Sequence, residues 1–162
     1  MKAAFTLHVN GKEHAVEVEP RRTLADTLRE NCGQTGTHIG CEHGVCGACT
    51  VLVDGEPMRS CLMFAVQAAG RKIRTVEGLA SHADGKEILH PLQSAFMEYH
   101  GLQCGYCTPG FLMLAAGTLE RDPDIGDEEL LEVLSSNLCR CTGYKNIVKA
   151  VRAAAARMRS RS

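Results

Sequence analysis

The chain has 162 residues, which is enough for one ordinary domain or two small ones. Lys and Arg total 18 against 19 Asp and Glu, and aromatic residues make up 4% of the chain, so neither a basic nucleic-acid surface nor a base-stacking surface is indicated. The sequence shows no signal-peptide core and no apolar run of membrane length, so we expect a cytoplasmic protein without a membrane-inserted segment.

The beginning of the chain predicts a hairpin followed by a helix. Alternating apolar and polar residues flank Asn10-Gly11, and this pair between two such runs is a strong hairpin signal. Thr23 is the expected N-cap of a helix that ends near Gly33. Downstream, residues 50–53 and 73–76 predict two further short strands, so we expect a small mixed sheet around one helix.

The second half of the chain changes to a helical period. Leu92 and Phe96 belong to a row of apolar residues at helical spacing. Thr108 is the expected N-cap of a second helix, with Pro109 at its first helical position. The sequence predicts four helices in all, at about 89–99, 109–120, 127–134 and 144–158. Four helices with short links indicate a bundle.

Nine cysteines are the most informative feature of the composition. Clustered cysteines in a reducing compartment usually indicate metal or redox chemistry, because structural disulfides are rare there. They form two groups of four with one left over, at Cys41, Cys46, Cys49 and Cys61, at Cys104, Cys107, Cys139 and Cys141, and at Cys32. We expect Cys32 to be a buried thiol that packs like a small apolar residue.

The first group has the spacing of a plant-type 2Fe-2S site. Cys41, Cys46 and Cys49 follow the pattern C-x4-C-x2-C, and Cys61 comes from a separate segment. The loop from 35 to 47 is rich in glycine, which lets the backbone bend closely around a compact cluster. Zinc is the weaker alternative, because zinc sites commonly use two C-x2-C pairs and this group has one.

The second group consists of two close pairs. Cys104 and Cys107 form one pair and Cys139 and Cys141 the other, each at a predicted turn between helices. The two turns can meet at one end of a bundle and offer four thiolates. Taken alone, this spacing fits zinc almost as well as an iron–sulfur cluster.

Two histidines lie in or beside the first loop. A Rieske centre would need both as ligands in place of two cysteines. Because four cysteines are already available, we expect His38 and His43 either to lie next to the cluster without binding iron or to face solvent. Glu42 is read as a loop residue without a special role.

With both motifs in view, the chain resembles the small iron–sulfur subunit of the molybdenum hydroxylases, the group of xanthine dehydrogenase, aldehyde oxidoreductase and carbon monoxide dehydrogenase. The likeness extends from about residue 5 to 155 and includes both cysteine motifs in the family's order. The matching stretches are 36–41, 44–51, 60–62, 103–110 and 137–144. Glu42-His43 departs from the small or neutral pair often found there, which could alter a potential but removes no ligand.

The resemblance implies an α+β fold with two cluster-binding domains. We predict a β-grasp, plant-type 2Fe-2S ferredoxin-like domain at 1–78, a linker at 79–86 and a four-helix 2Fe-2S domain at 87–162. It also implies that Gln103, directly before Cys104, contacts the molybdenum–pterin cofactor of a partner. No residue of this chain is expected to act as an acid, a base or a nucleophile.

The resemblance further implies partners. A large subunit would carry the molybdenum–pterin, in its cytosine dinucleotide form, and a medium subunit would carry FAD, in a heterotrimer or a dimer of heterotrimers. Electrons would pass from molybdenum to the helical-domain cluster, then to the ferredoxin-domain cluster, then to FAD. The substrate would be a heteroaromatic compound or an aldehyde, with CO less favoured. Two alternatives stay open: a free-standing double-cluster ferredoxin and a zinc-stabilised binding module.

Overall fold

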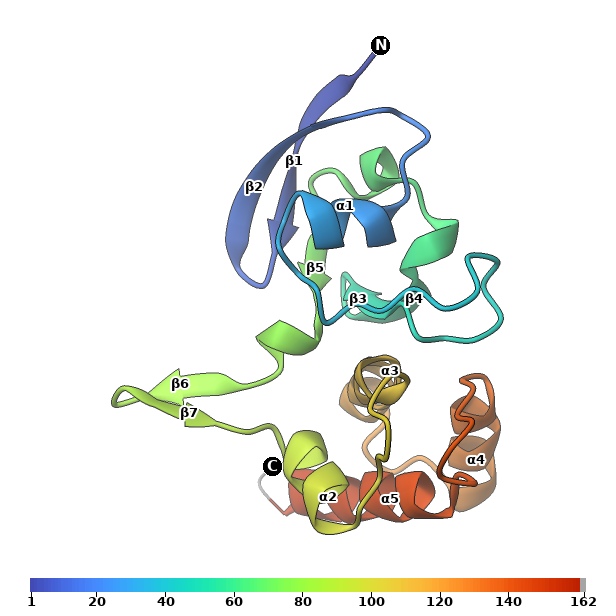
Figure 1. Ribbon diagram of the computed structural model, residues 1–162. Helices are drawn as coiled ribbons and strands as arrows, with labels where there is room; N and C mark the ends of the chain where they lie inside the picture. Colours follow the sequence, from blue (N-terminus) through green and yellow to red (C-terminus); the bar gives the residue numbers. More distant parts are fainter. Residues whose placement is uncertain (161–162) are drawn as a thin grey trace.

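The computed structural model describes residues 1–160 and has two parts. Figure 1 shows a sheet wrapped around a short helix in one part and four helices in the other, with a small hairpin projecting to the side. The expected α+β fold class is confirmed. The last two residues of the predicted second domain, 161–162, lie outside the described residues.

The main sheet has five strands in the order β2-β1-β5-β3-β4. β1 and β5 are parallel, whereas the other neighbours are antiparallel. The strands are β1 (Ala3–Val9), β2 (Lys12–Val18), β3 (Thr50–Val53), β4 (Glu56–Arg59) and β5 (Lys72–Arg74), and the helix beside the sheet is α1 (Leu24–Glu30).

The predicted hairpin and the first helix are both present. Asn10 and Gly11 have φ values of 50° and 77°, and a two-residue turn of this hand matches the twist of β1 and β2. The Asp26 N–H donates to the Thr23 side chain at 3.1 Å, which confirms the expected N-cap of α1. Past its end, Gly33 has a φ of 69°, as a glycine that terminates a helix does.

The last strand of the sheet is shorter than predicted. The sequence pattern indicated 73–76, but β5 ends at Arg74 and a turn of 3-10 helix follows at Val76–Gly78. The reason lies at Thr75, whose backbone N–H donates to the Asn10 side chain at 2.9 Å instead of to a neighbouring strand. A side-chain acceptor therefore ends the strand, and the hydrophobic pattern does not reveal it.

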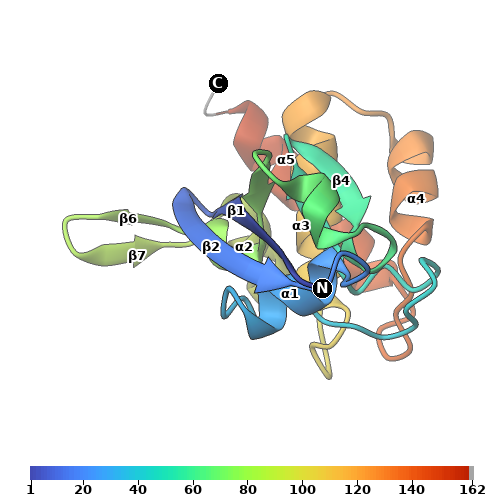
Figure 2. The same cartoon turned by 90° about the horizontal axis from the view of Figure 1, so that it is seen from above.

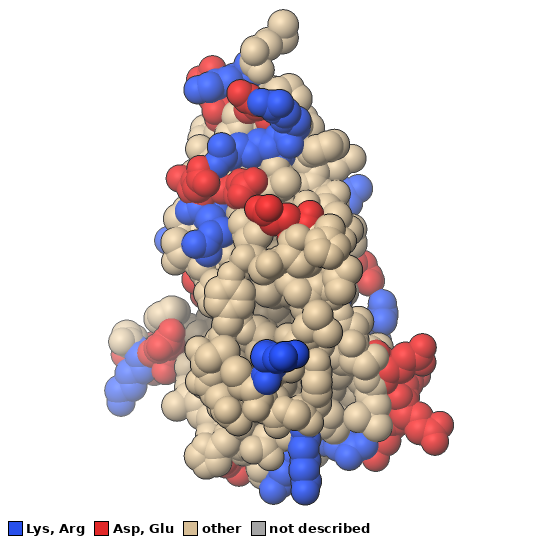
Figure 3. Space-filling view, turned by 45° about the vertical axis from the view of Figure 1, so that its right-hand side comes forward, with Lys and Arg blue, Asp and Glu red and all other residues tan. Residues whose placement is uncertain are grey.

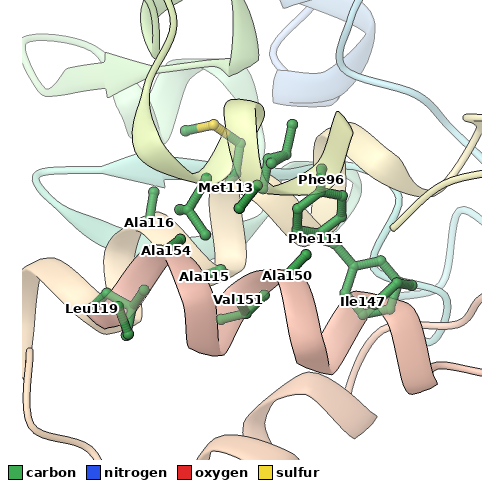
Figure 4. Close-up of a cluster of buried hydrophobic side chains, with 14 of the residues drawn as sticks. Phe96, Phe111, Met113, Ala115, Ala116, Leu119, Ile147, Ala150, Val151 and Ala154 are labelled. Atoms are coloured by element: carbon green, nitrogen blue, oxygen red, sulfur yellow. The ribbon is translucent and has the colours of Figure 1, made fainter. Parts of the chain in front are cut away.

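The four helices are α2 (Pro91–Glu98), α3 (Thr108–Arg121), α4 (Asp127–Ser135) and α5 (Lys145–Arg159). Figures 1 and 2 show α3 between the sheet and the other helices. Every residue from 110 to 119 is buried. Figure 4 shows the core of this part, in which Phe96 and Phe111 lie close to Ile147 and Val151 of α5. Burial of this apolar surface is the main force that holds the helices together.

The start of α3 differs from the prediction. Cys107, rather than Thr108, is the N-cap, and Thr108 is the first helical residue. The Phe111 N–H donates to the Cys107 carbonyl at 3.1 Å, so the helical bonding begins at the cysteine itself. The helix is therefore attached directly to the second cysteine group.

The predicted linker at 79–86 contains regular structure. Strands β6 (Ser81–Ala83) and β7 (Lys86–Ile88) form an exposed hairpin, joined at Asp84-Gly85 with φ values of 51° and 72°. Asp-Gly is a hairpin signal that we read only as a sign of a linker. The domain boundary itself stays a prediction. In the described part of the chain, none of the helices is long and apolar enough to span a membrane.

Candidate metal centres

The first group of cysteines lies together as two pairs of thiols. The Cys41 and Cys46 side chains interact with each other, and so do the Cys49 and Cys61 side chains. The Cys46 backbone N–H also points at the Cys41 sulfur, at 3.4 Å. All four predicted ligands of this group are therefore brought to one place by the loop and the segment after β4.

The loop that carries three of these cysteines needs a special backbone. Glu42, Gly44 and Gly47 all have positive φ values, of 56°, 84° and 73°. A Cβ on Gly44 would lie 2.4 Å from a methyl carbon of Leu62, next to Cys61. Glycine is therefore required where the loop passes the segment of the fourth cysteine.

The cysteines of the first group differ in pKa because their surroundings differ. The backbone N–H of Cys46 lowers the pKa of Cys41 from 9.0 to about 6, with further help from His43 and Val45. Burial, followed by the hydrogen bond to Cys49, raises the pKa of Cys61 to about 12. In the metal-free chain the half-buried Cys41 therefore favours a thiolate and the buried Cys61 keeps its proton.

The second group also forms two pairs, across two turns. Cys104 and Cys107 lie between α2 and α3, and Cys139 and Cys141 lie between α4 and α5. The Cys104 and Cys141 side chains interact across the two turns, and so do the Cys107 and Cys139 side chains. The predicted meeting of the two turns is thus present, with Cys104 and Cys141 exposed and the other pair half-buried.

Thr142 and Tyr144 hold Cys139 in position. The Thr142 N–H and hydroxyl lie 3.5 Å and 3.0 Å from the Cys139 sulfur, and the Tyr144 hydroxyl accepts the Cys139 N–H at 2.9 Å. Burial opposes ionisation of Cys139, but the bonds from Thr142 outweigh it and lower its pKa. Its neighbour Cys107 has a pKa raised to about 12, by burial first and then by Cys139.

A paired arrangement suits a two-iron cluster. In a four-cysteine 2Fe-2S site each iron takes two thiolates, so the ligands come as two pairs rather than as four groups around one ion. Among residues 1–160 no group of three or more His, Cys, Asp and Glu side chains could hold a single metal ion. The thiols and the N–H groups beside them fit the chemistry of two such clusters.

The two cysteine groups are in direct contact through their loops. The Leu138 N–H donates to the Cys46 carbonyl at 2.9 Å, and the Tyr106 hydroxyl donates to the Ile39 carbonyl at 2.6 Å. The Tyr106 ring also stacks on His38, with centroids 4.8 Å apart. Nothing in the cysteine spacing indicated these contacts, because they join segments far apart in the sequence.

The other residues singled out in the sequence are Gln103, the two histidines and Cys32, and the structure shows the surroundings of each. Gln103 is exposed directly before Cys104. His43 is exposed and its Nδ1 lies 2.5 Å from the Cys41 carbonyl, whereas His38 bonds the Tyr106 carbonyl at 2.8 Å. Cys32 is 7% exposed within the sheet core, and burial raises its pKa, as expected for a thiol that serves as packing.

Exposed apolar side chains lie beside the cysteines of both groups, together with the exposed charged residues Glu42 and Arg140. Figure 3 shows a face whose middle carries few charged side chains, with charges gathered at one end and at the margins. Large apolar side chains are exposed beside the cysteines, namely Val45, Leu62, Leu102, Tyr106 and Leu138. Exposed apolar side chains gathered near one site are typical of a protein–protein interface.

Comparison with known proteins matches both halves of the chain. Residues 7–80 match the model of a 2Fe-2S iron-sulfur cluster binding domain, and residues 75–152 match that of a second 2Fe-2S binding domain. The nicotine 6-hydroxylase small subunit of Paenarthrobacter nicotinovorans is 54% identical over 150 residues, covering 93% of this chain and 88% of the relative. The caffeine dehydrogenase subunit gamma of Pseudomonas sp. (strain CBB1) is 56% identical over 151 residues, covering 91% and 88%.

A solved structure agrees with these relatives. A chain of quinoline 2-oxidoreductase from Pseudomonas putida 86 superposes with a TM-score of 0.89 at 50% identity, covering 98% of this chain and 97% of that chain. Identity of this order over nearly the whole length, with both cluster-binding domains matched, shows the family. The chain belongs to the small 2Fe-2S subunits of the molybdenum hydroxylases, and is thus a subunit of an oxidoreductase complex.

Proposed function

We propose that this chain relays electrons, one at a time, from a molybdenum–pterin centre on a large partner subunit to FAD on a medium partner subunit. When bound, 2Fe-2S clusters supply reversible one-electron acceptor sites. The observation that carries the proposal is the arrangement of eight thiols in four pairs, with the two groups joined by the Leu138–Cys46 hydrogen bond. Nothing in this relay requires an acid, a base or a nucleophile from the chain.

The proposed cluster ligands are the eight paired cysteines. Cys41, Cys46, Cys49 and Cys61 would hold one cluster, and the other group would hold the second. One cysteine in each group has a lowered pKa and would bind readily as a thiolate. These are Cys41 and Cys139, where nearby N–H groups stabilise negatively charged sulfur. The same N–H groups would set the reduction potential of the bound cluster, since hydrogen bonds to sulfur stabilise the reduced state.

The two groups differ in their access to partners. Cys104 and Cys141 are exposed, and Gln103 beside them is free to contact a neighbouring subunit. We propose that this edge faces the molybdenum–pterin, in its cytosine dinucleotide form, and that Gln103 contacts it. The first group, with exposed Val45 and Leu62, would then face the FAD subunit. The interfaces would exclude water and keep the distance between cofactors fixed.

The class of substrate follows from the relatives. The names of the two relatives and of the solved structure refer to nicotine, caffeine and quinoline, which are nitrogen heteroaromatic compounds. We therefore propose that the complex containing this chain oxidises a heteroaromatic compound, with an aldehyde as the second choice. The substrate would bind to the large subunit, so no residue of this chain would select it.

Copurification tests the partner proposal directly. The chain, carrying an affinity tag, would be isolated under gentle conditions from cells that contain its natural partners. We expect two larger chains in equal amounts, one with molybdenum and one with FAD. Isolation of the chain alone, with both clusters intact, would instead identify a free-standing ferredoxin. The matched control is a variant with Val45→Asp and Leu62→Asp, which places charges on the apolar surface and should weaken the association.

A further inference from the structure

The segments that carry the two cysteine groups meet at three buried residues, Gly47, Gly110 and Asn137, which we call the joint. Gly47 lies in the loop of the first group, Gly110 in the first turn of α3, and Asn137 just past the end of α4. The joint therefore connects the first group to both halves of the second group.

The joint depends on close backbone approach. A Cβ on Gly110 would lie 2.3 Å from the Gly47 carbonyl oxygen, and a Cβ on Gly47 would lie 2.0 Å from the Asn137 Oδ1. A side chain at position 110 would meet the backbone of the first group's loop, so it would move the two segments apart, whereas a side chain at position 47 would displace the Asn137 amide. The steric fit thus fixes the separation of the loop from α3 and the place of the Asn137 side chain.

The hydrogen bond at the joint needs the N–H donor of the Asn137 side-chain amide. Asn137 is 1% exposed, and its Nδ2 donates to the Gly47 carbonyl at 3.3 Å. Its Oδ1 has no hydrogen-bond partner among residues 1–160. A buried oxygen without a partner is unfavourable, and an apolar side chain of the same size would avoid that cost. The donor side of the amide is what the joint uses.

Two adjacent hydrogen bonds link the segment after α4 to the loop of the first group, and the two segments run in opposite directions. Asn137 bonds Gly47 through its side chain, and Leu138 bonds Cys46 through its backbone at 2.9 Å. The pattern resembles an antiparallel pair in which a side-chain amide replaces one backbone donor. Two bonds on neighbouring residues hold both the distance and the orientation of these segments more firmly than one bond would.

We propose that Asn137 is a positioning residue for electron transfer between the two cysteine groups, which holds Gly47 and thereby fixes the spacing of the bound clusters. The step is the movement of one electron from the reduced centre to the oxidised one, with no bond formed or broken and no proton required. Asn137 touches neither centre and acts through the Gly47 peptide. This inference rests on the proposed function, since it assumes that both groups bind 2Fe-2S clusters.

The test compares five variants of the full chain, three at the joint and two controls, by low-temperature EPR with both centres reduced. Asn137→Asp keeps the size and removes the N–H donor, and Asn137→Ala removes the amide. Asn146→Ala is the matched control, because Asn146 is exposed on α5 and its Nδ2 donates to the His100 carbonyl at 3.4 Å, away from the joint. Gly55→Ala controls for Gly47→Ala, since both have positive φ but a Cβ on Gly55 would meet nothing.

We expect both Asn137 variants and Gly47→Ala to weaken or lose the magnetic splitting between the two reduced centres, while Asn146→Ala and Gly55→Ala keep it. Electron transfer between the centres should slow in these three variants and keep its rate in both controls. An unchanged splitting in an Asn137 variant with full iron content would overturn the inference alone. Loss of iron from both Asn137 variants would also overturn it, because Asn137 would then serve cluster assembly. A wild-type chain without two iron signals would instead refute the proposed function.

Discussion

The backbone N–H of Leu138 donates a hydrogen bond to the carbonyl oxygen of Cys46 at 2.9 Å. Leu138 directly precedes Cys139, so a ligand proposed for one cluster lies one residue and one hydrogen bond from a ligand proposed for the other. The contact joins the loop before β3 to the turn before α5, although the two are far apart in the sequence. The fold thus brings the two separate cysteine motifs into direct contact, as the proposed relay requires.

Replacement of a single ligand should remove only one cluster. Cys104→Ser breaks the Cys104–Cys141 pair and leaves the first group untouched. We expect iron to fall from about four to about two per chain, with loss of one of two 2Fe-2S signals. Iron analysis and EPR of the same sample measure both. Cys32→Ser is the matched control, because that thiol lies in the sheet core; two intact signals in Cys104→Ser would refute the ligand assignment.

Gln103 offers a test of contact with the molybdenum partner. Gln103→Ala removes an exposed amide next to Cys104 and should not disturb either thiol pair. In the intact complex we expect substrate to reduce the clusters more slowly, by about tenfold if the amide forms one hydrogen bond worth about 1.4 kcal/mol. Stopped-flow absorbance measures this rate. Lys86→Ala on the distant hairpin should leave it unchanged, and an unaltered rate in Gln103→Ala would exclude the pterin contact.

The metal-free chain should gain stability from Cys41 as the pH rises. The Cys46 backbone N–H lowers the Cys41 pKa in the folded state from 9.0 to about 6. A depressed pKa stabilises the fold fully above the unfolded pKa, and this contribution is lost as the pH falls from 9.0 through about 6. Denaturant unfolding of the metal-free chain across that window measures it.

Serine variants of Cys41 and Cys61 test how each thiol changes the pH dependence of the free energy of unfolding. Cys41→Ser should flatten the dependence of the unfolding free energy on pH between about 6 and 9.0. Cys61 has the opposite behaviour, because its pKa is raised to about 12, so its contribution is complete below pH 9.0 and lost as the pH rises towards 12. Cys61→Ser should therefore change only the alkaline side. An identical profile in wild type and Cys41→Ser would contradict the assignment.

Tyr144 should stabilise the turn of the second group. Tyr144→Phe removes the acceptor of the Cys139 N–H, which is half-buried. We expect a loss of about 1 kcal/mol in the free energy of unfolding, the usual effect of leaving such a donor without its partner. Chemical denaturation measures the change. Tyr99→Phe is the control, because its hydroxyl lies beside exposed Glu98 and its loss should cost less than about 0.5 kcal/mol.

The sequence predicted most of the elements because their signals are local. The Asn10-Gly11 turn, the Thr23 cap and the helical rows that became α2 to α5 all depend on residues a few positions apart. The pairing of the second cysteine group was predictable for a related reason. Each pair lies at a turn between helices. Because short links make successive helices antiparallel, the first and third turns lie at the same end of the bundle.

The remaining features depend on contacts between distant segments. The end of β5 is set by the Asn10 side chain, and the joint is set by Asn137 against Gly47. No periodicity or spacing encodes such a contact, since each residue taken alone is an ordinary loop residue. The Asp84-Gly85 turn is different, because its hairpin signal is present in the sequence but the surrounding glycine and polar residues also indicate a linker.

Low-temperature EPR of the dithionite-reduced chain, with iron and acid-labile sulfide counted on the same sample, tests the central claim most directly. Eight paired cysteines predict two distinct 2Fe-2S signals and about four irons per chain. Zinc in place of iron, with no EPR signal in protein isolated without oxygen, would contradict the electron relay.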